Sequence, residues 1–405
     1  MCYRNCQIIP NGFCNIPNSG LWFSIEFKQS GRVFRGSGII TKMRVRIIYS
    51  FAARFSQNFK ILTEYMIRIK TTVATLSILT FAVNSFSQTT GSTTKAERDS
   101  LNFPKRVATF AADKFALTRP LNIEFTQTAS FNFKSEKNGN PLPESRINRF
   151  QQVKVSANIN LIQRKTWILG TTLGYRLTSA AGDMGKAGAS EISFSNDYHY
   201  LFSALNLTYF SSLFGKRIVY SSSLLVDGSE KHLERVKGIF TGTMVLKANQ
   251  STKMTVGLLV SIDPSAPTPF VPTFSYEHKF NNGLIADLVL PRSVYLRKFV
   301  FNRNGRISLG SELDRTAFYL YNLDGTNQKY EYGQLDINSG LTYEHAIGRH
   351  FMLTAKSGMK YTPSGRIFKK EDSFADPVYK ITPDPSFYFN IGISFNPFSI
   401  LGKRK

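Results

Sequence analysis

Residues 386–396 read SFYFNIGISFN, and the order of apolar and polar side chains in this stretch indicates the fold. Apolar residues occupy every second position: Phe387, Phe389, Ile391, Ile393 and Phe395. Smaller or polar residues fill the positions between them: Tyr388, Asn390, Gly392, Ser394 and Asn396. A period of two residues places each set on one face of a β-strand.

The same alternation recurs from Gln151 onward, beginning with Val153, Val155 and Ala157 opposite Lys154 and Ser156. Many of these segments run about 10–14 residues, which is enough to cross a bilayer at a tilt. A soluble β-sandwich would alternate too, but its strands are usually about 5–6 residues long. We therefore predict an all-β fold, a transmembrane antiparallel up-and-down β-barrel of 12–14 strands with an apolar outside and a polar lumen.

The connections between the predicted strands alternate between short and long. Short periplasmic turns and longer extracellular loops are typical of such barrels. The uncertain point is Pro291 to Ser293, a short connection where a long one is expected; a single bent element there would reduce fourteen strands to twelve. The predicted long connections are 135–149, 179–198, 227–235, 263–269, 321–330 and 363–384.

Composition agrees with a barrel and gives little support to other classes. The mean hydropathy of −0.17 is too polar for a helical membrane protein. The formal net charge is +24, of which residues 88–405 carry +15, but these charges are scattered singly rather than clustered as in a nucleic-acid surface. All three cysteines lie within the first 14 residues, and their spacing does not indicate a metal site. We expect no cofactor, no metal and no nucleic-acid partner.

A second start lies inside the chain. Met66 opens a stretch with the positive residues Arg68 and Lys70, a short apolar core and small residues at 85 and 87, in the order of a secretory signal peptide. Cleavage is expected between Ser87 and Gln88. The predicted organisation is an upstream, disordered extension over 1–65, a signal peptide over 66–87, a periplasmic lead-in over 88–118, a barrel over 119–398 and a basic tail over 399–405.

The inward faces of the strands carry most of the charge. A Lys or Arg facing lipid at mid-membrane costs about 2–4 kcal/mol, so charged strand residues are expected to point inward. They either pair across the lumen and fill it or line a solute path. The predicted lumen-facing residues are Lys154, Arg176, Lys253, Glu277, Lys279, Asp287, Glu312, Asp336, Glu344, Lys356 and Lys360.

Over about 120–398 the chain resembles uncharacterised outer-membrane β-barrel proteins of Bacteroidetes-type bacteria, a family of unknown function. The stretches that carry the resemblance are 290–297, LPRSVYLR, 308–314, SLGSELD, and 389–395, FNIGISF. The resemblance implies export to the outer membrane, lipid and lipopolysaccharide as surroundings, and recognition of the last strand by the barrel assembly machinery. The residues implied in that signal are Phe389, Ile391, Ile393, Phe395 and Phe398.

We expect a non-enzymatic barrel, either a narrow channel for small solutes or a structural barrel, with an unknown solute. The alternative is a barrel-embedded lipid hydrolase, which needs a nucleophile beside a base. His199 with Ser193 or Ser195 is the combination that the sequence offers for such a site, and no nucleophile-elbow motif accompanies it.

Overall fold

The computed structural model describes residues 7–9, 13–15, 23–24, 95–186, 189–323, 325, 327–397, 399 and 401. It divides into two units, 1–92 and 93–405. Within the first, β1 (Gln7–Ile9), β2 (Phe13–Asn15) and β3 (Phe23–Ser24) form a small antiparallel sheet, in a region where we expected disorder. The predicted cleavage site at Ser87 and Gln88 lies outside the described residues. No helix among the described residues is long and apolar enough to span a membrane.

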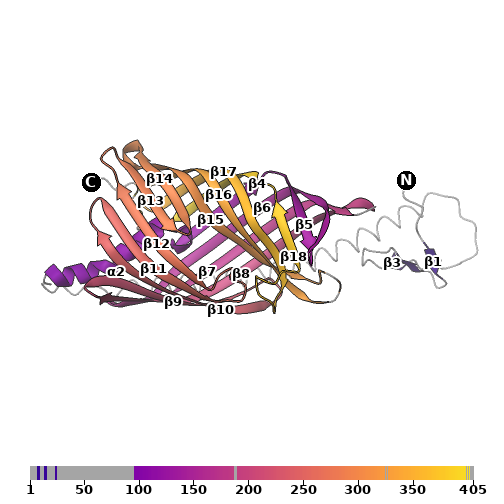
Figure 1. Ribbon diagram of the computed structural model, residues 1–405, viewed down its shortest axis with the longest axis horizontal. Coiled ribbons are helices and arrows are strands. Elements are labelled where there is room, and N and C mark those ends of the chain that lie inside the picture. The colour runs from indigo at the N-terminus through magenta and orange to yellow at the C-terminus, as the bar shows by residue number, and fades with distance from the viewer. Residues whose placement is uncertain are drawn as a thin grey trace, which may run out of the picture. The chain divides into compact units, whose positions relative to one another are not determined.

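The second unit is a closed antiparallel sheet preceded by a helix (Figure 1). The helix α2 (Lys95–Lys114) and the short 3-10 helix η2 (Ala116–Thr118) come first. The strands that follow are β4 (Leu121–Thr128), β5 (Phe131–Lys137), β6 (Asn140–Gln163), β7 (Trp167–Lys186), β8 (Ala189–Leu213), β9 (Lys216–Gly228), β10 (Leu233–Ala248), β11 (Thr252–Ile262), β12 (Phe270–Lys279), β13 (Leu284–Leu290), β14 (Ser293–Val300), β15 (Gly305–Tyr321), β16 (Lys329–Ile347), β17 (Phe351–Lys369), β18 (Tyr379–Pro383) and β19 (Ser386–Phe395).

Consecutive strands from β6 to β17 pair with each other, and β19 closes the sheet on β4, with Leu121 of β4 opposite Phe395 of β19. The sheet has sixteen strands. Because β4 and β5 both pair with β6, and β18 and β19 both pair with β17, these are two interrupted crossings, and the barrel has fourteen crossings. The predicted up-and-down barrel of 12–14 strands is confirmed.

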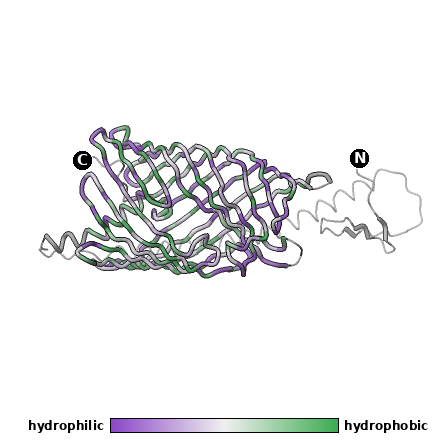
Figure 2. The backbone as a smooth tube through the Cα atoms, in the orientation of Figure 1, coloured by the Kyte–Doolittle hydropathy of each residue, from purple (hydrophilic) through white to green (hydrophobic). Residues whose placement is uncertain are grey.

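Hydrophobic and hydrophilic residues alternate along the strands (Figure 2). In β19 the apolar set Phe387, Phe389, Ile391 and Ile393 is 41–52 % exposed, while Tyr388, Asn390 and Ser394 between them are at most 4 % exposed. The first set faces outward, where lipid would cover it, and the second faces the lumen. Phe398 lies outside the described residues, and the role of this strand in assembly stays a prediction.

Two of the expected long loops are strands instead. Residues 135–149 form the ends of β5 and β6 around a two-residue turn, with Asn138 and Gly139 at φ 49° and 83°. Positive φ at both positions suits a tight hairpin turn, which Asn-Gly supplies. In the same way β7 and β8 extend through most of 179–198. Sequence periodicity missed these extensions because polar and charged residues, glycine and proline interrupt the apolar alternation over 135–149 and 179–198.

The segment around Pro291 is a turn between two separate strands and not a bend in one. β13 and β14 have only 7 and 8 residues, far fewer than their neighbours β15 and β16 with 17 and 19. The last residue of β15 that pairs with β14 is Glu312, opposite Ser293. From Leu313 onward the one strand that pairs with β15 in the described part of the chain is β16, and this part of the wall is free to leave the cylinder.

Candidate functional site: a lumen closed from both ends

The lumen is occupied, from the end at which β4 begins and β19 ends, by the end of α2 and by η2, called here the plug segment, residues 111–119. Lys114 at the C-terminus of α2 has a side chain only 2 % exposed, and Ala112 is 1 % exposed. A cation in the last turn of a helix also interacts favourably with the helix dipole. In our sequence analysis this region belonged to a lead-in; the structure instead places its last part inside the barrel.

Ion pairs hold the plug segment against the wall. Lys114 Nζ lies 2.7 Å from a carboxylate oxygen of Asp287 and also contacts Glu277. The acidic residue next to Lys114 is paired with a cation of the wall: Arg306 Nη1 donates to Asp113 Oδ1 at 2.7 Å. Arg119 Nη2 donates to Glu344 Oε1 at 3.0 Å, and its Nη1 donates to Ser394 Oγ at 2.9 Å. The inserted end thus meets strands β12, β13, β15, β16 and β19 through charged and polar groups.

The charges around Asp113 favour its ionised form. Burial alone would raise the pKa of this carboxyl group, but Arg306, Lys114 and Arg297 together hold the pKa well below its usual range. Asp113 therefore stays charged at neutral pH inside the lumen, where an unpaired carboxylate would be costly.

The outer half of the lumen is filled by the hairpin of β15 and β16, called here the folded-in hairpin, residues 313–321 and 329–337. Consecutive residues such as Phe318 and Tyr319 are 6 % and 3 % exposed, so both faces of the strand are covered. One face meets β6 and β8: the Phe318 ring stacks on Tyr198 with centroids 4.2 Å apart, and Gln152 Nε2 donates to Thr316 Oγ1 at 3.0 Å. A hairpin that stayed in the wall would expose one of these faces to lipid.

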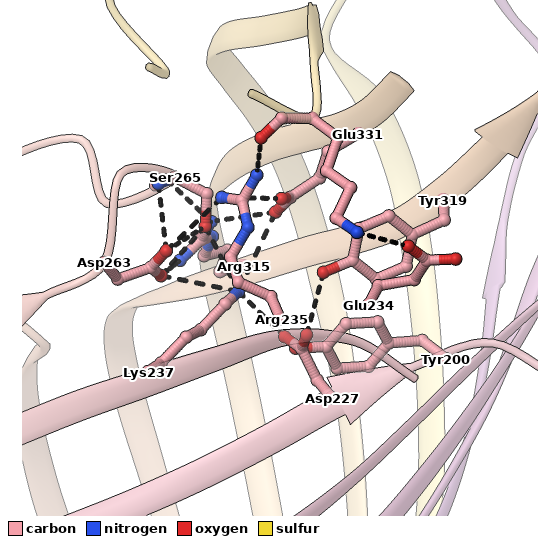
Figure 3. A network of polar contacts seen from close by, with 11 residues as sticks. Tyr200, Asp227, Glu234, Arg235, Lys237, Asp263, Ser265, Arg315, Tyr319 and Glu331 are labelled. Atoms are coloured by element: carbon pink, nitrogen blue, oxygen red, sulfur yellow. Dashed lines mark hydrogen bonds and ion pairs between the residues drawn. The ribbon is translucent and has the colours of Figure 1, made fainter. Parts of the chain in front are cut away.

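The other face of the folded-in hairpin meets a polar cluster on β9, β10 and the 263–269 connection (Figure 3). We call this the outer network. Glu331 of β16 is fully buried and lies 3.2 Å from Arg235 and 3.5 Å from Arg315. Its other members in the figure are Tyr200, Asp227, Glu234, Lys237, Asp263, Ser265 and Tyr319.

Direct contacts tie the outer network together. Tyr319 Oη donates to Asp227 Oδ1 at 2.8 Å, and Lys237 Nζ lies 2.8 Å from Asp227 Oδ2. Asp263, in the connection after β11, accepts from the backbone N–H and the hydroxyl of Ser265. Burial opposes the ionisation of Asp263, but Lys237, these hydrogen bonds and Arg315 lower its pKa overall. The folded-in hairpin is therefore fastened by buried charge on one side and by aromatic stacking on the other.

A cavity of about 410 Å³ remains between the plug segment and the folded-in hairpin. We call it the mid-lumen chamber. Asp113 and Arg119 line it on the plug side, Glu124, Lys154, Lys356 and Asn390 on the wall, and Asp314 and Arg315 at the hairpin. Much of its charge is already paired: Lys154 contacts Asp314, and Lys356 Nζ donates to Glu312 Oε1 at 2.5 Å.

A row of glycines lies on the inward faces of three strands, between two tyrosines that line this chamber. Gly310, Gly340 and Gly358 pair side by side on β15, β16 and β17, with Tyr295 and Tyr388 at the two ends of the row. A Cβ atom added at Gly340 would lie 2.1 Å from the backbone oxygen of Ser357, so the strands approach too closely there for any larger residue. Tyr295 Oη in turn donates to Glu312 at 2.9 Å.

The register places the eleven predicted lumen residues on inward positions, and ten of them have a polar contact. Lys154, Glu312 and Lys356 border the mid-lumen chamber, and Arg176 donates to the backbone oxygen of Arg315 at 2.5 Å. Glu277, Asp287 and Glu344 contact the plug segment, while Lys253 Nζ donates to Glu277 at 2.7 Å. Lys360 lies 3.3 Å from Asp336. Lys279 is exposed, and no ion pair to it is found among the described residues.

The residues that close the lumen were not among the predicted site residues. Asp113, Lys114 and Arg119 precede the first strand and carry no strand pattern. Arg297 and Arg306 lie on strands and share the inward parity of Tyr295 and Ser308. A count of charges by strand parity would have included these two arginines.

The residues of the alternative hydrolase site do not come together. His199 Nδ1 is 2.8 Å from the Tyr175 hydroxyl, and Ser193 instead donates to Asp183 at 2.6 Å. Ser195 is four residues from His199 on the same strand, about 13 Å at the usual rise. His199 has the parity of the exposed Leu201 and Leu205, so it lies on the outward face. No group of three or more metal-binding side chains occurs among the described residues.

No family model matches the chain, and no curated protein matches it. Similar solved structures include outer membrane phospholipase A from Escherichia coli, with 9 % identity, 67 % of this chain and 96 % of that chain covered, and a TM-score of 0.27. An outer membrane channel from Pseudomonas putida F1 has 9 % identity, coverages of 68 % and 94 %, and a TM-score of 0.28. The outer membrane protease OmpT from Escherichia coli has 6 % identity, coverages of 68 % and 96 %, and a TM-score of 0.23. Because these scores are low, the fold assignment rests on the strands of this chain.

Proposed function

We propose that this protein is a non-enzymatic outer-membrane barrel that passes small polar solutes through a lumen closed, in the described state, by the plug segment. The outward apolar faces and the inward charged faces support a place in the outer membrane, as does the predicted secretory signal. The observation that carries the proposal is that a chain segment separate from the wall closes the periplasmic mouth through ion pairs.

The chemistry of these contacts suits a removable closure. A segment held by a large apolar interface would have to expose that surface to water on leaving. Here the inserted end offers Asp113, Lys114 and Arg119 to charged wall residues, and water can hydrate the same groups when they separate. The net stabilisation from a buried ion pair is small when both partners can be rehydrated.

A second candidate is a structural barrel that never opens, and the folded-in hairpin favours it. Its residues, including Thr316 and Glu331 at 0 % exposure, block the outer half of the lumen and belong to the wall itself. A lipid hydrolase has less support, because the described partner of His199 is the Tyr175 hydroxyl and Ser193 donates to Asp183 instead.

Solute entry into vesicles tests the proposal. We expect proteoliposomes with the native barrel to swell slowly in an isosmotic solution of a small sugar, and those with the double variant Asp113→Asn/Lys114→Met to swell several-fold faster. Lys105→Met is the matched control, because Lys105 is an exposed residue of α2 outside the plug segment. Equal swelling for all three correctly folded proteins would reject the passage and favour the structural barrel.

A further inference from the structure

The mid-lumen chamber carries polar groups that the protein itself leaves unsatisfied. Five side-chain oxygens that line it are buried and have no hydrogen-bond partner among the described residues: Ser156 Oγ, Ser308 Oγ, Asn338 Oδ1, Thr354 Oγ1 and Asn390 Oδ1. Their residues are 2–7 % exposed and come from five strands, β6, β15, β16, β17 and β19. A buried polar group without a partner costs about 1–3 kcal/mol, so five around one cavity need an explanation.

The charges of the chamber are, by contrast, largely compensated. The wall cations Lys154 and Lys356 already have Asp314 and Glu312 as partners, and Arg119 has Glu344. A strongly charged ligand would have to compete with these pairs. The groups that remain available are hydroxyls, which both donate and accept, and amide oxygens, which accept.

A solute with several hydroxyl groups matches this set. Each hydroxyl can donate to Asn338 or Asn390 and accept from a serine or threonine. The tyrosine rings at the ends of the glycine row, Tyr295 and Tyr388, also line the chamber and offer flat apolar surface to the C–H face of a sugar ring. The volume of about 410 Å³ falls within the range usual for small-molecule sites.

We propose that the mid-lumen chamber binds a small neutral polyhydroxylated solute, of the size of a monosaccharide, through Ser156, Ser308, Asn338, Thr354 and Asn390. This rests on the proposed function in one respect, since it names the solute class of the same lumen. Arg292, an exposed residue of the β13–β14 turn, also lines the chamber, and the proposal places the entry of the solute beside it, so that binding does not require that the plug segment leaves.

Calorimetric titration of the full chain in detergent with D-glucose and with myo-inositol tests the proposal. We expect saturable binding, weakened about fivefold or more by Thr354→Val and by Ser156→Ala, as the loss of one hydrogen bond implies. Ser339→Ala is the matched control: its hydroxyl contacts Ser311 at 2.7 Å on the outward face, and it should bind like the native protein. Sodium acetate, the probe for an anion site, should give no saturable heat.

The stability of the barrel without ligand gives a second test, because a substitution that weakens sugar binding should not destabilise the unliganded protein. Because the Thr354 hydroxyl has no hydrogen-bond partner in the part of the chain that the structure describes, Thr354→Val should leave the unliganded barrel as stable as the native protein or more stable, while it lowers the stabilisation by sugar. Sugars also stabilise proteins by exclusion from their surface, so the difference between variants is the relevant quantity. The absence of saturable sugar binding, saturable acetate binding, or equal binding by Thr354→Val and the native protein would overturn the proposal. If the vesicles swell but the protein binds no sugar, the proposal of a sugar site in the mid-lumen chamber is refuted and the proposed passage of solutes is not. If the protein binds sugar but the vesicles do not swell, the proposed passage is refuted and the sugar site is not.

Discussion

The ion pairs of Lys114 give a quantitative prediction for the plug segment. Replacing Lys114 by Met keeps most of the side-chain length and removes the charge that contacts Glu277 and Asp287. Removing one partner of a buried pair typically costs 3–5 kcal/mol. Here Asp287 keeps Arg297 Nε at 2.9 Å, and Glu277 keeps Lys253 Nζ at 2.7 Å, so we expect the low end, about 3 kcal/mol.

A loss of about 3 kcal/mol increases the population with an undocked plug segment about 100-fold. Thiol labelling can measure this, because Ala112 is 1 % exposed when the segment is docked. In a protein whose three native cysteines are replaced by serine, we expect Ala112→Cys to react with a maleimide about 100-fold faster when Lys114 is also Met. The variant Lys105→Met serves as the control, since Lys105 is exposed. An unchanged labelling rate would show that these ion pairs do not hold the segment.

Three further predictions concern pH, the glycine row and the lipid face. The pKa of Asp113 is lowered in the docked state, so its contribution to docking is complete above the ordinary pKa of about 3.9 and is lost as the pH falls below that value. Solute entry should therefore rise between pH 4 and pH 3. The rise should be smaller in Asp113→Asn, whose solute entry is already raised at pH 7. Gly340→Ala should destabilise the barrel by about 1–3 kcal/mol in urea unfolding, because its Cβ would lie 2.1 Å from the Ser357 oxygen, and Ser339→Ala next to it should change little. Leu341 lies at an outward position and is 49 % exposed, so Leu341→Arg should lower the free energy of unfolding in lipid vesicles by about 2–4 kcal/mol if the residue lies near the membrane midplane. Thr342→Arg, at the adjacent inward position, should lower it less. Equal losses would contradict the assigned faces.

The alternation of apolar and polar residues was enough to predict the barrel and the faces of its strands. In β19 and in β6 from Gln151 onward, lipid on one side and water or polar groups on the other impose a strict period of two. The ends of β5 to β8 at the β5–β6 and β7–β8 turns were harder to predict, because polar and charged residues, glycine and proline interrupt the period of two there. Turn chemistry at Asn138-Gly139 was the remaining local signal.

The closure of the lumen could not be predicted from the same pattern. Lys114 and Asp113 form their contacts with residues more than 160 positions away, and nothing in the local sequence indicates them. The folded-in hairpin did leave a signal. Arg315 and Glu331 lie at positions whose parity is outward in the lower part of β15 and β16, and charge there would be costly in lipid. Two such residues opposite the short β13–β14 hairpin indicate that this part of the wall turns inward.

Single-channel current across a planar bilayer tests the closure by the plug segment most directly. The native barrel and a barrel that lacks residues 95–117 should be compared after both are shown to be folded by heat-modifiable migration on gels. We expect a closed native barrel with rare, brief openings, and a steady conductance once the segment is absent. A folded barrel without the segment that carries no current would contradict the account and leave the folded-in hairpin as a permanent seal.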